Sequence, residues 1–185
     1  MSKSFVHLHA HTEYSMLDGA AKIDDYLDRV KELNQPGAAI TDHGNLYGAL
    51  EFYHSALKKK LIPIIGYEAY VINDSRFDRP DRENNKRYHL TLLAENTVGY
   101  WNLVKMASKA FTEGYYYKPR VDYELLKDHS EGIIALSGCL GGEISQFLAP
   151  DGSVEEGNQE GERSFSKALE KARFYQSIFG ENNFY

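Results

Sequence analysis

Three histidines alternate with apolar residues near the start of the chain, and this pattern constrains the fold more than any other feature. The stretch 5–12 reads Phe-Val-His-Leu-His-Ala-His-Thr. In an extended strand successive side chains point to opposite faces, so His7, His9 and His11 would share one face. Imidazole is the commonest protein ligand for transition metals. The stretch therefore predicts a strand that presents histidines to a metal. The alternative is that one or two of them are ordinary surface or hydrogen-bonded histidines.

Apolar and amphipathic segments alternate along the rest of the chain. Strand-like segments are expected at 38–41, 62–72, 88–93, 132–139 and from 183, and helices at 23–33, 49–56, 97–112, 122–126, from about 142, and at 164–179. The segments 73–87 and 114–120 are expected to be connecting loops. This alternation is typical of a parallel sheet with crossover helices, and both an open doubly wound sheet and a closed barrel fit it. No GxGxxG fingerprint follows the first strand, so a dinucleotide-binding fold is not favoured.

Composition limits the class of protein. With 185 residues, 42% of them hydrophobic, the chain is sufficient for one globular domain over 1–185. The formal net charge of −6 argues against a free-standing nucleic-acid binder, but not against a nuclease whose metal ions supply positive charge. Cys139 is the single cysteine, and no apolar run suits a signal peptide or membrane span, so we expect a cytoplasmic protein with no membrane partner. The acidic stretch 151–162 is expected to be a surface insertion.

Side chains that can bind metals occur on or just after each of the first five expected strands. Taken singly they have ordinary explanations: Asp42 could cap a helix, Glu68 could lie at the surface, and Cys139 could be a small buried hydrophobe. Their recurrence at strand ends, where parallel α/β folds build their sites, favours one shared site. The candidates are His9, His11, Asp18, Asp42, His43, Glu68, His89 and Cys139.

The chemistry of this set indicates a cluster of ions. Its mixture of imidazole, carboxylate and thiol donors suits Zn, Mn or Fe better than Mg or Ca. The set is too large for one tetrahedral zinc, so we expect two or three divalent ions, most naturally Zn. Clustered ions of this kind lower the pKa of bound water and stabilise the charge that develops in phosphoryl displacement. The residues therefore predict a metal-dependent phosphoesterase.

Three short motifs carry a resemblance to a known family. His9-Ala10-His11-Thr12, the stretch 41–44 (Thr-Asp-His-Gly) and the stretch 137–139 (Ser-Gly-Cys) resemble the first three motifs of the PHP (polymerase and histidinol phosphatase) family. The longer stretches 5–19, 40–45 and 63–70 are similar to the PHP domains at the N-terminus of bacterial replicative DNA polymerase III alpha subunits. The resemblance extends over almost the whole chain, apart from the acidic stretch.

The resemblance implies a distorted parallel (β/α)7 barrel with a trinuclear metal site at the C-terminal ends of its strands. In polymerases that keep the site, the domain is a metal-dependent 3′–5′ exonuclease that acts on the primer 3′ end of DNA. The expected partners are that primer end, the remainder of a polymerase chain and replisome subunits. Asp42 is the expected catalytic residue and falls beside the ligands, where it would orient a neighbour, and His7 is not assigned. The ligand positions fall on His9, His11, Asp18, His43, Glu68, His89 and Cys139.

One family feature is missing from the sequence. The final Asp-x-His motif is absent, which predicts a barrel truncated before its last strands. Two alternatives to the exonuclease therefore stay open. One is a stand-alone phosphatase of the histidinol-phosphatase type, and the other is a non-catalytic, metal-stabilised scaffold module of the polymerase. Two further segments are weaker candidates for contacts with DNA: the basic residues of loop 73–87, and the tyrosines at 115–117, which could stack on an unpaired base.

Overall fold

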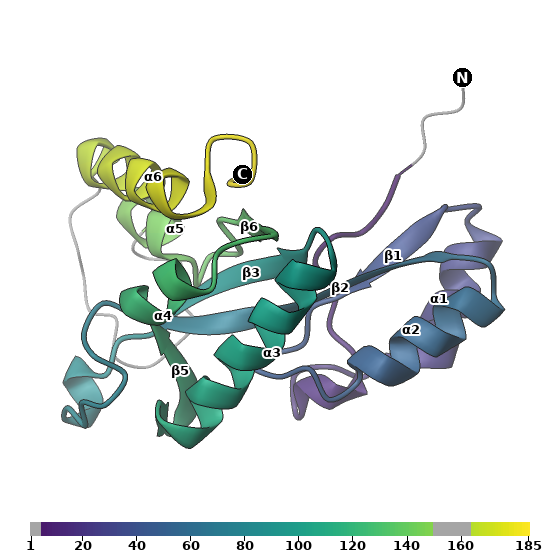
Figure 1. The fold of residues 1–185 in the computed structure, drawn as a ribbon, viewed down its shortest axis with the longest axis horizontal. Helices are drawn as coiled ribbons and strands as arrows, with labels where there is room; N and C mark the ends of the chain where they lie inside the picture. The colour runs from purple at the N-terminus through teal and green to yellow at the C-terminus, as the bar shows by residue number, and fades with distance from the viewer. Residues whose placement is uncertain (1–4, 150–163) are drawn as a thin grey trace.

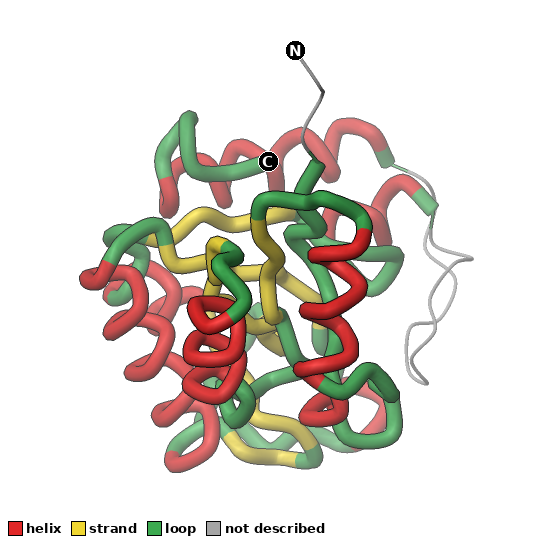
Figure 2. The backbone as a smooth tube through the Cα atoms, turned by 90° about the vertical axis from the view of Figure 1, so that its right-hand side faces the viewer, coloured by secondary structure: helices red, strands yellow, loops and turns green. Residues whose placement is uncertain are grey.

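A computed structural model of the chain describes residues 5–149 and 164–185. The strands lie in the interior and the helices pack around them (Figure 1 and Figure 2). The α/β class expected from the sequence is confirmed. The acidic stretch 151–162 lies outside the described residues. In chain order the elements are η1 (Glu13–Ser15), α1 (Ile23–Glu32), β1 (Gly37–Ile40), α2 (Ala49–Lys58), β2 (Ile62–Ile72), η2 (Arg82–Asn84), β3 (Tyr88–Ala94), α3 (Thr97–Thr112), β4 (Tyr115–Tyr116), β5 (Lys118–Asp122), α4 (Tyr123–Asp128), β6 (Ile133–Leu136), α5 (Glu143–Leu148) and α6 (Phe165–Phe179).

Strand β2 is the centre of the sheet. Its first residues pair in parallel with β1, and its last residues pair in parallel with β5. Its other edge pairs antiparallel with β3, which in turn pairs antiparallel with β6. Two successive antiparallel pairings restore the direction, so β1, β2, β5 and β6 all run the same way. A parallel bridge between Ala135 and Phe184 adds one further residue pair beyond β6.

The sheet departs from a purely parallel barrel at β3. This strand runs against its neighbours, so its N-terminal end lies where the other strands have their C-terminal ends. His89 is the second residue of β3 and reaches the common edge for that reason, not because it ends a strand. The described residues form six strands, whereas the expected barrel has seven. The expected connector after α3 is also more ordered than predicted, because it forms the short antiparallel pair β4 and β5.

The stretch 5–12 was expected to be a strand, and this prediction is wrong in detail. The chain there is extended but bends at Leu8 and His9. It still bonds to β1, because the Ala39 N–H donates to the His7 carbonyl at 3.1 Å. Further along, the hydroxyl of Thr41 accepts from the Ala10 N–H at 2.8 Å and donates to the Ala10 carbonyl at 3.0 Å. A side chain therefore supplies contacts that the backbone would make in a regular ladder.

Two hydrophobic clusters fix the helices to the sheet. The smaller joins α1 and α2 to β1 through residues such as Leu27 and Phe52, both fully buried. The larger lies between α3, α4, α6 and the strands β2, β3 and β6, with Tyr67, Leu92 and Met106 at its centre. Burial of a Leu, Met or Phe side chain is worth roughly 1.5–3 kcal/mol, so these clusters stabilise the frame that carries the polar site.

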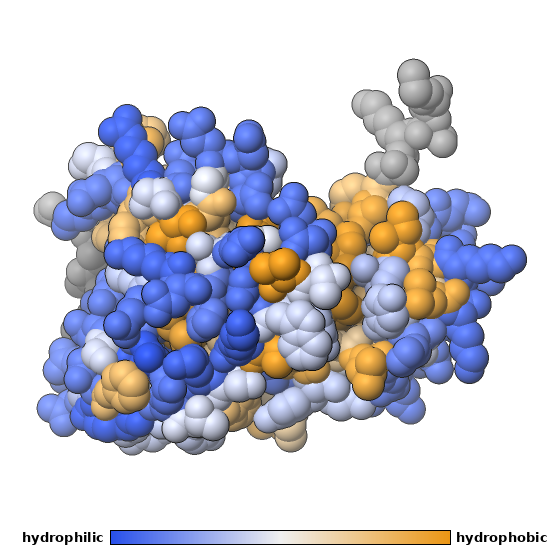
Figure 3. Space-filling view, in the orientation of Figure 1, coloured by the Kyte–Doolittle hydropathy of each residue, from blue (hydrophilic) through white to orange (hydrophobic). Residues whose placement is uncertain are grey.

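The surface also exposes apolar side chains. Figure 3 shows hydrophobic residues over the part of the molecule that holds α2 and the start of β2, where Leu50 and Ile62 are largely exposed. A cavity of about 440 Å³ lies there, lined in part by Tyr53, Pro63 and Tyr100, and none of the predicted metal ligands lines it. Among the helices that the structure describes, none combines the length and apolar character needed to cross a membrane.

Candidate metal centre

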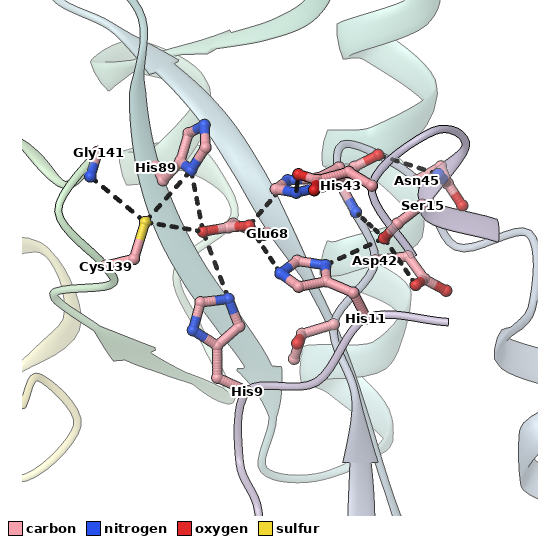
Figure 4. Close-up of polar contacts among 12 residues, drawn as sticks. His9, His11, Ser15, Asp42, His43, Asn45, Glu68, His89, Cys139 and Gly141 are labelled. Carbon is pink, nitrogen blue, oxygen red and sulfur yellow. Dashed lines mark hydrogen bonds and ion pairs between the residues drawn. The ribbon is translucent and has the colours of Figure 1, made fainter. Parts of the chain in front are cut away.

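Glu68 lies at the centre of a group of imidazoles and one thiol. It sits on β2, and only 1% of its surface is exposed. One carboxylate oxygen, Oε1, is 3.4 Å from His9 Nε2, 3.1 Å from His89 Nδ1 and 3.7 Å from Cys139 Sγ. The other, Oε2, is 3.2 Å from His11 Nε2 and 2.8 Å from His43 Nδ1. Figure 4 shows these side chains converging on Glu68 from both sides.

Backbone pairing explains why residues so far apart in sequence meet at Glu68. The loop after β1 continues beside β2, because the Glu68 N–H donates to Asp42 O at 3.0 Å and the Gly44 N–H donates to Glu68 O at 2.8 Å. On the other edge, the His89 N–H donates to Gly141 O at 2.9 Å and so holds the loop after β6 beside the start of β3. The Gly141 N–H in turn donates to Cys139 Sγ at 3.3 Å. Sheet register thus places both flanks of the site.

The spacing of these atoms suits bound cations. Two ligands that share a tetrahedral zinc at about 2.1 Å lie roughly 3.4 Å apart, which is close to the distances around Glu68. His9 Nε2, His43 Nδ1 and Glu68 Oε2 are buried and, in strict geometry, make no hydrogen bond. A buried carboxylate that faces lone pairs without shared protons is costly unless a cation lies between them. The described residues contain two possible ligand triads: His9, His11 and Glu68, and His43, Glu68 and His89.

A buried hydrogen-bond chain sets the protonation of His11. The Ser15 hydroxyl donates to Asp42 Oδ1 at 2.8 Å and accepts from the His43 N–H at 3.1 Å. The single proton of the Ser15 hydroxyl is therefore used in the bond to Asp42. At the 3.0 Å contact between Ser15 Oγ and His11 Nδ1, the imidazole must then be the donor. A neutral His11 with its proton on Nδ1 directs the Nε2 lone pair towards Glu68. This is the arrangement that orients a metal-binding histidine from behind.

Asp42 is the anchor of this chain. It is 1% exposed, and its carboxylate accepts from the Thr12 N–H at 2.6 Å and from the Thr12 hydroxyl at 2.7 Å, in addition to Ser15. These hydrogen bonds engage both carboxylate oxygens of Asp42, behind the histidines. Asp42 is therefore placed to position His11 and not to contact a substrate. The sequence suggested this orienting place for Asp42, but it gave no sign of Ser15: a single hydroxyl in a loop has no periodicity or spacing that marks it.

Asp18 belongs to the site through His43 alone. Its Oδ2 lies 2.8 Å from His43 Nε2, while the other ring nitrogen of His43 faces Glu68. A neutral imidazole has one N–H, so one of these two carboxylate contacts lacks a proton unless the ring is charged. The Asp18 side chain is 77% exposed, in contrast to the buried carboxylate of Glu68.

The electrostatics of Glu68 follow from its neighbours. Burial by itself raises the pKa of a carboxyl, but imidazole N–H groups of His11, His43, His89 and His9 directed at the carboxylate, or a cation in place of their protons, outweigh burial and hold the pKa of Glu68 well below its usual range. Glu68 is therefore ionised at neutral pH, in the form that binds a cation.

The structure gathers five of the other six predicted ligands around Glu68 and places the remaining one, Asp18, against His43. His7, which was not assigned as a ligand, is exposed and contacts Phe5. The function of the seven predicted residues as metal ligands stays a prediction. In the basic loop 73–87, Arg76 is buried and paired with Asp122 at 3.0 Å, so it holds the loop to β5 and does not face solvent.

A cavity of about 330 Å³ opens at this site. Its lining includes Asp18, His43 and His89 of the predicted centre together with Tyr115 and Tyr117. The predicted metal centre is therefore accessible through this cavity. Of the three tyrosines singled out in the sequence, Tyr115 and Tyr117 line it, whereas the Tyr116 hydroxyl donates to the Pro80 carbonyl at 2.9 Å.

Comparisons with known proteins show which family the chain is similar to. Over 151 residues the chain is 56% identical to DNA polymerase III subunit alpha of Thermus aquaticus, covering 80% of this chain and 12% of that protein. It is 47% identical to DNA polymerase III subunit alpha of Helicobacter pylori over 184 residues, covering 100% of this chain and 15% of that protein. The chain thus spans only about one seventh of the length of these relatives. Among solved structures, an amidohydrolase from Chromobacterium violaceum is 20% identical over 57% of this chain and 32% of that chain, with a TM-score of 0.39. The PHP domain family matches residues 7–185, and the chain belongs to that family.

Proposed function

We propose that this chain is the PHP domain of a replicative DNA polymerase III alpha subunit and acts as a metal-dependent 3′–5′ exonuclease. The observation that carries the proposal is the buried carboxylate of Glu68 with four imidazoles directed at it from three separate parts of the chain. A group of this kind is expensive to bury without cations, and this one opens into a cavity. The similarity to polymerase alpha subunits supports the choice of DNA as substrate.

Two or three divalent ions are proposed as the cofactor, with Zn favoured and Mn or Fe as alternatives, because nitrogen and sulfur donors outnumber carboxylates. Glu68 is common to both triads and would bridge two ions. When bound, such ions act as Lewis acids that activate water and stabilise negative charge on a phosphodiester. The remaining proposed ligands are Asp18, beside His43, and Cys139, whose sulfur lies 3.5 Å from His89 Nδ1.

The chain's own residues orient this centre. Asp42 and Ser15 keep a proton on His11 Nδ1 and so leave Nε2 free to bind a cation. Asp18 gives the exposed side of the centre a negative charge that holds His43 in place. The buried position of Glu68 keeps its carboxylate away from bulk water, and the cavity gives access to the centre on the side of Asp18, His43 and His89.

The proposed partners follow from the same assignment. They are the 3′ end of a DNA primer, the remainder of the polymerase chain and subunits of a replisome, in the cytoplasm. The relatives are about seven times as long as this chain, and polymerisation would belong to those other parts.

The test is an exonuclease assay on a primer with a mismatched 3′ end. We expect the metal-loaded chain to shorten the primer, a chelator to stop the reaction, and His11→Ala to lower the rate at least about 100-fold, since a ligand is lost. His54→Ala is the matched control, because His54 lies exposed on α2 outside the cluster. Bound metal per chain should be measured in both variants.

The outcomes separate the alternatives. Turnover of histidinol phosphate without any action on DNA would replace the exonuclease by a phosphatase. Bound metal with neither activity would identify a scaffold module. If the His11→Ala variant shortened the primer at the normal rate, the metal centre would have no part in the reaction.

A further inference from the structure

The cavity beside the predicted metal centre is an aromatic cleft. Its volume of about 330 Å³ lies at the lower end of the range of ~300–1,000 Å³ typical of small-molecule sites. Besides three residues of the centre, its lining contains many large rings and one lysine, Lys118. The aromatic residues among the described lining are Tyr14, Tyr47, Tyr70, Phe111, Tyr115 and Tyr117.

The outer aromatic rings form a row whose exposed members are not part of the buried core. Tyr47 contacts Phe111 with ring centroids 5.9 Å apart, and Phe111 stacks on Tyr115 at 6.1 Å. Tyr47, Tyr115 and Tyr117 keep 61%, 54% and 63% of their surface exposed. Tyr47 comes from the loop after β1, Phe111 from the last turn of α3, and Tyr115 and Tyr117 from β4 and the residue that follows it. Large exposed rings at the mouth of a site are platforms for a planar ligand.

The inner end of the cleft connects this row to the metal centre. Tyr70 stacks on the His43 ring with centroids 6.0 Å apart and an interplanar angle of 17°. The ammonium group of Lys118 lies 5.1 Å from the centre of the Tyr70 ring. A positive charge thus lines the same cleft as the exposed rings and three of the predicted site residues, where it favours an anionic group of a ligand.

The backbone around the cleft is held in place. Asn45 accepts from the Tyr47 N–H at 3.0 Å and donates to the carbonyl oxygens of Tyr14 and His43, which ties the aromatic rim to the metal loop. Tyr117 has a φ of 61°, a left-handed conformation that costs a non-glycine residue energy and is concentrated at functional sites. The cleft is therefore organised before any ligand arrives.

We propose that this cleft binds the base of the terminal nucleotide, which stacks on Tyr115 and Tyr117 while its phosphate lies near Lys118. The proposal deepens the exonuclease assignment and rests on it for the identity of the ligand. A base can enter the cleft only when it is unpaired, so the substrate is a single-stranded or frayed 3′ end. Stacking of one base on aromatic side chains changes affinity by about 5- to 150-fold.

The experiment compares two labelled single strands of DNA that differ only in their 3′-terminal residue, which is a normal nucleotide in one and abasic in the other. Binding is measured in chelator, so that neither strand is cut. We expect the abasic strand to bind about 5- to 150-fold more weakly. The double variant Tyr115→Leu/Tyr117→Leu should reduce this ratio to about 1, and Tyr115→Phe/Tyr117→Phe should restore it. Trp101→Leu is the matched control, because Trp101 is 56% exposed on α3 but does not line the cleft.

The result that overturns the proposal is equal affinity of the wild-type chain for both strands, or a ratio that survives in the double leucine variant. Cleavage of both strands by the metal-loaded chain, with equal affinities, would reject the base site and retain the exonuclease. A normal affinity ratio without cleavage of either strand would support the base site and reject the exonuclease.

Discussion

Ser15 shows how much a single side chain can decide at the residue scale. Its hydroxyl has one proton, and Asp42 takes it. His11 must then donate from Nδ1, and its Nε2 is left as a lone pair that faces Glu68. The same hydroxyl also accepts the backbone N–H of His43, so one oxygen positions two of the four histidines in the group.

Ser15→Ala is therefore expected to weaken metal binding without removing any ligand. Loss of a group that orients a metal-bound histidine typically costs about 10- to 100-fold in affinity. Competition with a coloured chelator measures this directly. Ser177→Ala is the control, because Ser177 lies exposed on α6 and bonds only to the Phe174 carbonyl. Unchanged affinity in Ser15→Ala would show that Ser15 does not fix the orientation of His11.

At the scale of elements, α5 and α6 are joined by a buried carboxylate. Glu143 begins α5 and is 2% exposed, and it accepts from the hydroxyls of Tyr123 and Tyr175 at 2.8–2.9 Å. Lys171 Nζ lies 3.0 Å from Glu143 and balances its charge. Burial and the charge of Glu143 raise the pKa of Tyr175, so its hydroxyl keeps the proton that it donates. Because α5 follows the loop that carries Cys139, this group of residues also fixes one flank of the metal centre.

Removing one of these donors should destabilise the whole chain. Tyr175→Phe takes a hydrogen bond from a buried carboxylate and should lower the free energy of unfolding by about 1.5–3 kcal/mol. Urea unfolding followed by circular dichroism measures the change. Tyr53→Phe, on the exposed side of α2, should stay within about 0.5 kcal/mol of the wild type. A Tyr175→Phe protein as stable as the control would mean that the hydroxyl contributes nothing.

At the scale of the whole molecule, the proposed ligands connect distant parts of the chain. They extend from His9 to Cys139 and belong to segments on both edges of β2. A cation bound by them would act as a cross-link between the small hydrophobic cluster of α1 and α2 and the large one around α3 and α6. Binding to the folded state alone stabilises it by mass action.

Removal of metal should therefore lower the melting temperature. At a free metal concentration about 100 times Kd, binding contributes roughly 2.7 kcal/mol, which corresponds to a shift of about 5–10 °C for a chain of this size. Differential scanning calorimetry with and without chelator tests this, and the shift should be smaller in His11→Ala. If chelator left the melting temperature of a metal-loaded sample unchanged, the proposed cross-link would not exist.

The sequence by itself determined the α/β class, most element positions and the residues that meet at Glu68, because periodicity and strand-end position are local properties. It could not show that β3 runs antiparallel, since nothing within residues 88–94 depends on strand direction, and direction is set by pairing with β2 and β6. It could not show the bend at Leu8 and His9 either, because the Thr41 side chain that takes the Ala10 N–H in place of a backbone carbonyl is about 30 residues away. Tertiary structure alone placed Ser15 between Asp42 and His11, buried Arg76 against Asp122 and brought Tyr115 and Tyr117 to the mouth of the cleft, since each depends on contacts between segments that are remote in sequence.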